Sequence, residues 1–196
     1  MGKKIIVLCG SPRRKGNTNT VVRWMADAAK QAGAEVEVVD LARLKYKANG
    51  CTACMACQKS DKYECVIDDE ASPILRRIPE FDVVVMATPV YWFGPTAQLK
   101  LLLDRTFSLA KFDPQTGEPL SNAASRNRRL VLIATAGGDL DGGLNLLDAT
   151  FRTAAEFMKQ TYESLLVPLA PMDPKDLAAR DDVKNQATAL GKKLAT

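Results

Sequence analysis

The chain has 196 residues, a length typical of one domain, and its composition (46% hydrophobic, 26% charged, 6% aromatic) is that of a globular protein. The net charge of +4 is small and the basic residues are scattered, which argues against a nucleic-acid-binding groove. The sequence contains no histidine, so His-based acid–base catalysis, Ser-His-Asp or Cys-His triads and His metal ligands are excluded.

Apolar runs separated by polar or glycine-rich stretches predict strands that alternate with helices. In chain order we expect a strand at 3–9, a helix at 17–33, a strand at 35–41, a short helix at 69–77, a strand at 82–87, a helix at 95–109, a strand at 129–135, a helix at 144–161, a strand at 162–167 and a helix at 174–194. Gly33 would close the first helix, and Pro95 would begin the third. The polar segment 112–127 would be a loop, acting as an interface, a lid or a surface connection.

This alternation predicts βαβ units, and therefore an α/β fold with a parallel sheet and helices on both faces in a single domain spanning 1–196. Ligands of such sheets bind beyond the carboxyl ends of the strands, where the strand order reverses. The loops after the first, third and fourth strands are therefore the candidate sites.

No apolar run approaches the roughly 18 residues that a membrane-spanning helix needs. The apolar run after Met1 is also too short for the core of a signal peptide. We therefore expect a cytoplasmic protein without a membrane partner. Cysteines in that compartment stay reduced, which favours metal or redox chemistry over disulfides.

The loop after the first predicted strand, GSPRRKGNTN at 10–19, is rich in hydrogen-bond donors and leads into a helix. Backbone N–H groups and the helix dipole favour an anion at such a position. The loop matches neither the P-loop nor the G-x-G-x-x-G fingerprint. An ordinary polar turn is the alternative, but the density of donors favours a phosphate site.

Two further loops would lie at the same edge of the sheet. The segment TPVYWFGPT at 88–96 contains three consecutive aromatic residues, which suit stacking on a flat heterocycle, although a buried aromatic corner would explain one or two of them. The segment TAGGD at 135–139 lets the backbone approach a ligand closely. Together the three loops predict a site for a phosphorylated planar cofactor.

Four cysteines, Cys51, Cys54, Cys57 and Cys65, lie in a loop at 50–66 with spacings of two, two and seven residues. Thiolates at such spacing can surround one inorganic centre, so a metal or redox site is expected. A fifth cysteine, Cys9, falls in the first predicted strand and is expected to be a buried apolar residue.

GSPRRKGNT, the C-x2-C-x2-C motif with its later cysteine and Asp68-Asp69, and TPVYWFGPTAQLKLLLDR resemble the NADPH-dependent FMN reductase group of flavodoxin-like proteins. The compact cysteine spacing is similar to that of the iron–sulfur flavoproteins within this group. The resemblance covers nearly the whole chain. It implies a flavodoxin-like three-layer sandwich with a five-stranded parallel sheet in the order 2-1-3-4-5, and non-covalently bound FMN.

The resemblance also implies site residues. The FMN phosphate would bind to Ser11, Arg13, Asn17, Thr18 and Asn19. The isoalloxazine ring would lie against Pro89, Val90, Tyr91, Trp92, Phe93 and Gly94, with Ala136, Gly137 and Gly138 on its other side. A [4Fe–4S] cluster would be ligated by Cys51, Cys54, Cys57 and Cys65. No catalytic side chain is assigned, and Lys100, Asp104 and Arg105 are expected to form a solvated or ion-paired helix face.

The cysteines leave three interpretations open: a [4Fe–4S] cluster, a structural zinc ion, or empty thiols that pack near the flavin or at an oligomer contact. The expected function is an FMN-dependent oxidoreductase linked to NAD(P)H or to a ferredoxin. The alternatives are a flavodoxin-type electron carrier, a plain NAD(P)H-dependent FMN or quinone reductase without a cluster, and a zinc-stabilised binding module. The partners would be a small-molecule or redox-protein electron donor and acceptor, and the resemblance implies a homodimer or homotetramer.

Overall fold

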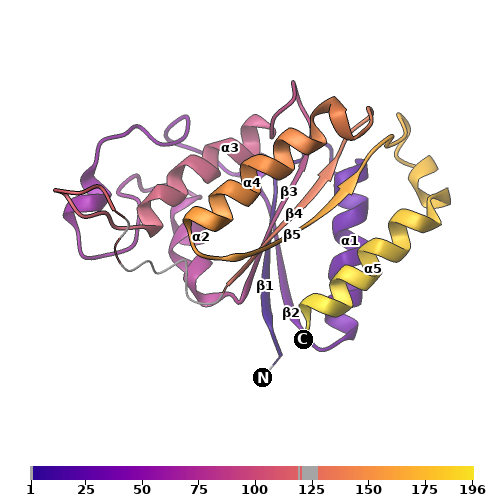
Figure 1. The fold of residues 1–196 in the computed structure, drawn as a ribbon, viewed down its shortest axis with the longest axis horizontal. Helices are drawn as coiled ribbons and strands as arrows, with labels where there is room; N and C mark the ends of the chain where they lie inside the picture. The colour runs from indigo at the N-terminus through magenta and orange to yellow at the C-terminus, as the bar shows by residue number, and fades with distance from the viewer. Residues whose placement is uncertain (1, 119, 121–127) are drawn as a thin grey trace.

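The computed structural model of the protein describes residues 2–118, 120 and 128–196. Residues 119 and 121–127 of the predicted loop at 112–127 lie outside the described residues. Five parallel strands form one sheet in the order β2-β1-β3-β4-β5, which confirms the expected topology (Figure 1). They are β1 (Lys4–Cys9), β2 (Glu35–Asp40), β3 (Val83–Pro89), β4 (Arg129–Thr135) and β5 (Thr161–Val167).

Helices cover both faces of the sheet (Figure 1). One face carries α1 (Asn17–Gln31) and α5 (Asp181–Leu194), and the other carries α2 (Ser72–Arg77), α3 (Ala97–Leu103) and α4 (Asn145–Phe157). The structure is therefore the three-layer sandwich that the sequence predicts.

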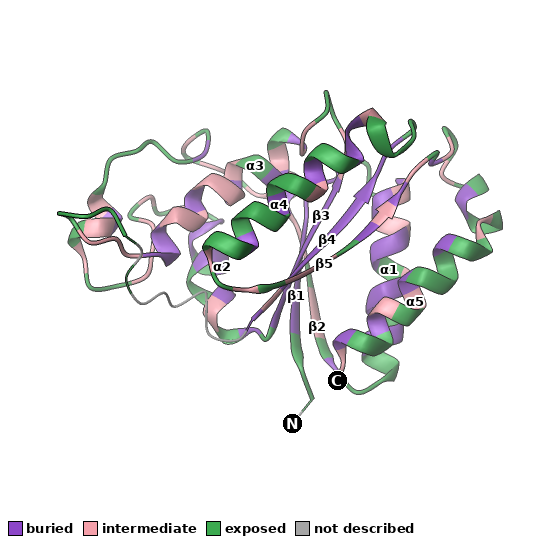
Figure 2. Ribbon diagram, viewed as in Figure 1, coloured by how far each residue is buried: buried purple, intermediate pink, exposed green. Residues whose placement is uncertain are grey.

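The central strands are buried on both faces (Figure 2). In β1, Ile5 and Val7 pack against the α1 and α5 layer, whereas Ile6 and Leu8 pack against the α2, α3 and α4 layer. Cys9 is buried as expected, and burial raises the pKa of its thiol to about 11. This thiol is therefore a structural group, not a reactive one.

All five helices differ from the predicted ranges at one or both ends, the last three the most, because local side-chain and backbone geometry decides where a helix begins and ends. The third begins at Ala97, since the Thr96 hydroxyl accepts a hydrogen bond from the Leu99 N–H at 3.3 Å and caps it. A 3-10 segment (Asp104–Leu109) then continues its path. The fourth ends at Phe157, because the chain turns into β5.

The predicted helix at 174–194 is two elements, a 3-10 turn (Asp176–Ala179) and α5. Arg180 separates them, with a backbone ψ of 74° that no helix allows.

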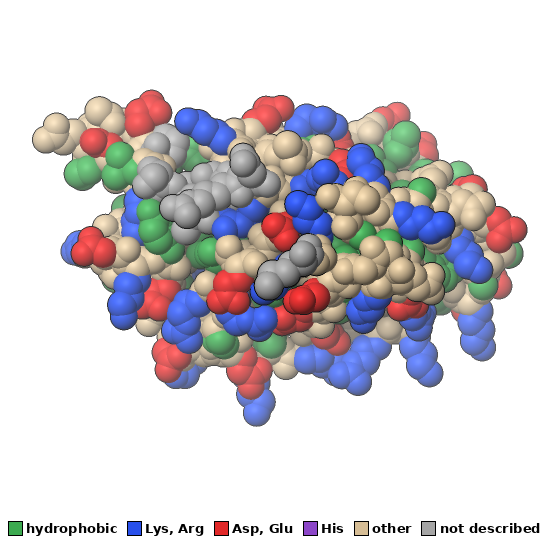
Figure 3. Space-filling model, turned by 90° about the horizontal axis from the view of Figure 1, so that it is seen from below, with side chains coloured by type: hydrophobic (Ala, Val, Ile, Leu, Met, Phe, Trp, Pro, Cys, Tyr) green, Lys and Arg blue, Asp and Glu red, His purple; other side chains and the backbone are tan. Residues whose placement is uncertain are grey.

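Figure 3 shows the face of the molecule seen from below Figure 1. Acidic and basic side chains are interspersed on this face, without a broad region of one sign. Among the described residues, no helix is long and apolar enough to cross a membrane.

Candidate functional site

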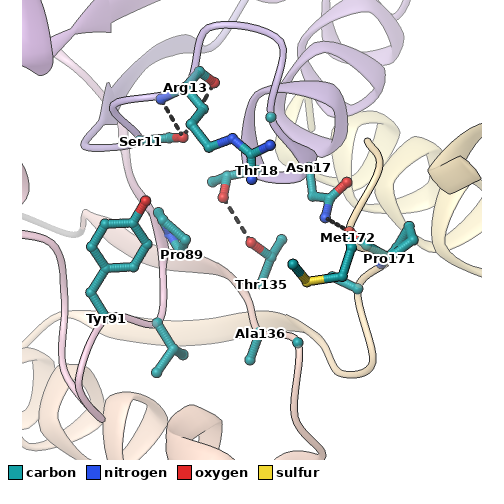
Figure 4. Close-up of a pocket in the computed structure, with 14 residues that line it drawn as sticks. Ser11, Arg13, Asn17, Thr18, Pro89, Tyr91, Thr135, Ala136, Pro171 and Met172 are labelled. Carbon is teal, nitrogen blue, oxygen red and sulfur yellow. Dashed lines mark hydrogen bonds between the residues drawn. The ribbon is translucent and has the colours of Figure 1, made fainter. Parts of the chain in front are cut away.

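A cleft with a volume of about 230 Å³ opens at the carboxyl ends of the strands. Its position agrees with the rule for open parallel sheets, because it lies where β1 and β3 are neighbours and the strand order reverses. Four loops contribute to its wall (Figure 4). The lining residues are Ser11, Arg13, Gly16, Asn17, Thr18, Pro89, Val90, Tyr91, Thr135, Ala136, Gly137, Ala170, Pro171 and Met172.

The N-terminus of α1 lies at this cleft without a capping side chain. Its N-cap residue is Gly16, which has no side chain to accept from the first N–H groups of the helix. The first turn contains no acidic residue, so the positive end of the helix dipole is not compensated locally. This end of α1 therefore offers hydrogen-bond donors and positive potential to a ligand.

Asn17 and Thr18 tie the start of α1 to the loops opposite (Figure 4). Asn17 Nδ2 donates to the Pro171 carbonyl at 2.8 Å, and the hydroxyl oxygens of Thr18 and Thr135 lie 2.8 Å apart in a buried hydrogen bond. Asn17 Oδ1 is buried and has no donor among the residues that the structure describes. An acceptor of this kind needs a donor from a ligand or water.

Asn19, a predicted phosphate ligand, does not line the cleft. Its Nδ2 donates to the Arg13 carbonyl at 3.0 Å and its Oδ1 accepts from the Cys9 thiol at 3.3 Å. Asn19 therefore braces the loop that carries Ser11 and Arg13.

The aromatic loop turns away from the cleft after Tyr91. Tyr91 and Gly94 exchange backbone hydrogen bonds of 2.9 and 3.1 Å, which closes a tight turn with Trp92 and Phe93 in its centre. Both central residues have positive φ values, 49° and 62°, a conformation that side chains other than glycine adopt at a cost of about 1–3 kcal/mol. The turn leaves Trp92 94% exposed.

The cleft thus brings together only part of the predicted set. Ser11, Arg13, Asn17, Thr18, Pro89, Val90, Tyr91, Ala136 and Gly137 line it, whereas Asn19, Trp92, Phe93, Gly94 and Gly138 do not. The sequence analysis missed Gly16, Thr135, Ala170, Pro171 and Met172. The last three follow β5, and the shared carboxyl edge of a parallel sheet was the available signal for them.

The four loop cysteines line a second cavity together with Arg105, Phe107 and Ser108, which follow α3. Cys57 is buried and Cys65 is half-buried, whereas Cys51 and Cys54 are exposed. Hydrogen bonds from the backbone of Ala56 and from Thr52 lower the pKa of Cys54. Within the described residues, no three Cys, Asp or Glu side chains are arranged to hold a metal ion.

Lys111 anchors this cysteine loop from one side. Its ammonium group donates to the backbone carbonyls of Cys57, Ser60 and Lys62 and lies 5.3 Å from the centre of the Tyr63 ring. These contacts fix the irregular chain between the third and fourth cysteines.

Arg105 anchors the chain just after this loop. Its guanidinium is buried, and Nη1 donates to both carboxylate oxygens of Asp69 at 2.9 and 2.8 Å. All three residues of the expected helix face are therefore ion-paired. The Lys100–Asp104 pair is exposed, whereas Arg105 is buried against Asp69.

The cleft and the cysteine cavity share no lining residue. In Figure 1 the cysteine loop lies at the left of the molecule, beyond α3. At the N-terminal end of α3, Thr96 donates to the Gly10 carbonyl at 2.7 Å, and Arg105 follows the other end. The two sites are therefore adjacent to opposite ends of one helix.

Comparisons with known proteins show which proteins this chain is similar to in sequence and in fold. The chain is 36% identical over 127 residues to an iron–sulfur flavoprotein of Methanocaldococcus jannaschii, a match that covers 63% of this chain and 64% of that protein, just under two thirds. An NAD(P)H:quinone oxidoreductase from Methanothermobacter marburgensis superposes with a TM-score of 0.76 at 18% identity, over 99% of this chain and 100% of the other. An FMN-dependent NADH-azoreductase from Bacillus anthracis in complex with FMN gives 0.74 at 14% identity, over the same shares.

At such low identities the two structural matches show the fold alone. The sequence gives a more specific result, since the family model for NADPH-dependent FMN reductases matches residues 3–168. That match includes the cysteine loop and the loops after β1, β3 and β4. The chain therefore belongs to the NADPH-dependent FMN reductase family.

Proposed function

We propose that the protein is an FMN-dependent oxidoreductase that takes electrons from NAD(P)H or a ferredoxin-type donor and passes them to a small-molecule or protein acceptor. One observation carries the proposal: the uncapped N-terminus of α1 opens into a cleft whose described lining contains no Asp or Glu. A dianionic phosphate suits such a site, because backbone donors, the helix dipole and Arg13 all favour negative charge there.

The remaining lining fits the other parts of FMN. The buried Asn17 Oδ1 lacks a donor, which costs about 1–3 kcal/mol, and a ribityl hydroxyl would satisfy it. Pro89 to Tyr91 and Ala136 to Gly137 would flank the ring. Bound there, FMN would supply hydride and one-electron chemistry. The described lining contains no His, Asp, Glu or Cys, and the role that we propose for the chain is to bind and orient FMN.

We also propose that the four cysteines ligate a [4Fe–4S] cluster. Support comes from the donor set, since four thiols line one cavity beside a buried cation. A [4Fe–4S] cluster takes four cysteine thiolates, which matches the four cysteines that line this cavity. Cys51, Cys54, Cys57 and Cys65 would hold the cluster, which would supply one-electron chemistry. Cytoplasmic localisation, a single domain and a homodimer or homotetramer stay predictions.

The phosphate site is tested by Arg13→Glu, with Arg14→Glu as the matched control. Arg13 lines the cleft, whereas its neighbour Arg14 lies 3.5 Å from Asp40 in an exposed pair outside it. We expect FMN affinity, measured by quenching of flavin fluorescence, to fall more than tenfold in Arg13→Glu and little in Arg14→Glu. Equal affinity in the two variants would contradict the assignment.

The metal and the electron donor need separate measurements. Absorption spectra with iron, sulfide and zinc analysis of anaerobically purified protein distinguish a cluster from a zinc ion or empty thiols. Steady oxidation of NAD(P)H would support a reductase. Reduction by a ferredoxin alone would support an electron carrier.

A further inference from the structure

The buried ion pair between Arg105 and Asp69 presents only its Arg105 member to the cysteine cavity. Arg105 lines this cavity and Asp69 does not. The cavity therefore meets the positive member of the pair. At low effective dielectric such a charge acts strongly on a neighbouring anion.

Most of the guanidinium is held in place by the chain. Besides the two bonds from Nη1 to Asp69, Nη2 donates to the Ile67 carbonyl at 2.9 Å and to the Ser72 hydroxyl at 3.3 Å. Nε is the exception: it is buried and finds no acceptor among the residues that the structure describes. Buried polar groups are nearly always hydrogen-bonded, so this Nε–H is a donor still available to a further acceptor.

The Cys65 sulfur lines the same cavity as Arg105. A thiolate at Cys65 would give Nε the charge-assisted acceptor that it lacks.

We propose that Arg105 is a positioning residue of the cysteine site, which presents its Nε–H and its positive charge to the Cys65 sulfur and raises the reduction potential of the cluster bound there. This inference rests on the proposed cluster. Adding one electron makes the cluster more negative, and a fixed cation beside a sulfur ligand stabilises that reduced form. Asp69, Ile67 and Ser72 hold the guanidinium so that it stays in place through the redox change.

The test is a redox titration of anaerobically reconstituted protein with dithionite, followed by electron paramagnetic resonance. The informative variant is Asp69→Asn/Arg105→Gln, which removes both charges together and leaves no buried ion unpaired. Lys100→Gln/Asp104→Asn is the matched control, because it removes an exposed pair at neighbouring positions. We expect the first double variant to bind iron and to be reduced at a lower potential, at least tenfold in equilibrium constant or about 59 mV for one electron. The control should keep the wild-type potential.

Arg105→Lys is the second variant, and it keeps the charge but loses the planar donor geometry. We expect a smaller lowering of the potential and a changed resonance line shape. Iron-loaded variants with the wild-type potential and line shape would overturn the role of Arg105 and leave the cluster standing. Failure of the wild type to bind iron would overturn the cluster and this inference together.

Discussion

The cleft and the cysteine cavity are built by different means. The wall of the cleft consists of the ends of four parallel strands and the start of α1, so the hydrogen bonds of the sheet set its position. The cysteine cavity lies in a loop without strands, which Arg105 and Lys111 hold through contacts with single side chains. A single substitution should therefore disturb the geometry of the cysteine cavity, whereas most single substitutions should leave the geometry of the cleft unchanged.

The largest effect is expected from Arg105→Met, which leaves the Asp69 carboxylate buried without its partner. We expect the free energy of unfolding to fall by about 3–5 kcal/mol, measured by urea denaturation. Lys100→Gln removes an exposed ion pair and should cost less than about 1 kcal/mol. Similar losses in the two variants would show that the buried pair contributes no more to stability than the exposed pair.

Gly143→Ala tests whether the cleft is as tolerant as the comparison suggests. Gly143 has a φ of 108°, and a Cβ there would lie 2.8 Å from Val90 Cγ1, in the cleft wall. We expect a loss of about 1–3 kcal/mol in stability and weaker FMN binding, because the loop after β3 must shift. Isothermal titration calorimetry measures the affinity. Retained affinity would mean that the wall relaxes without moving the ligand-facing atoms.

Lys111→Met keeps most of the side chain's volume and removes its charge and its bonds to three carbonyls. The freed carbonyls can bind water at this half-buried position, so we expect a modest loss of about 1–3 kcal/mol. Amide hydrogen exchange should accelerate in the loop at 57–65, whereas α1 and β1 should exchange as in the wild type. Unchanged exchange throughout would show that the loop is fixed by other contacts.

The smallest effect is a difference in acid sensitivity. Burial raises the pKa of Asp69, but hydrogen bonds from Arg105, the Lys47 N–H and Ser72 outweigh it and hold the pKa below its usual value. Stability from this group is complete above the unfolded-state pKa of about 3.9 and is lost as the pH falls through the lower folded value. The wild type should therefore lose more stability between pH 5 and 3 than Asp69→Asn/Arg105→Gln, measured by urea midpoints. Parallel pH profiles would contradict this assignment.

Much of the fold could be predicted from the sequence because its signals are local. The apolar runs of β1 and β4 are continuous, and the strand order follows from the family resemblance. Thr96 illustrates the limit: its hydroxyl caps α3 and also donates to the carbonyl of Gly10, which is distant in sequence.

The candidate site shows the same limit. The loop after β1 was found through its density of donors. Trp92 and Phe93 were assigned to the cleft by their aromatic character, but two consecutive positive φ values turn them outward. Arg105 is predicted to belong to a solvated or ion-paired helix face with Lys100 and Asp104, and its burial beside Asp69 is visible only in the tertiary structure.

The separation of the two sites by α3 has a consequence for how this family diversifies. The segment between β2 and α2 contributes every cysteine of the second cavity and no residue to the cleft wall. Evolution can therefore lengthen, shorten or replace this segment while selection on flavin binding stays unchanged. A lineage could acquire or lose a metal centre through an insertion or deletion in one exposed loop, without rebuilding the sheet.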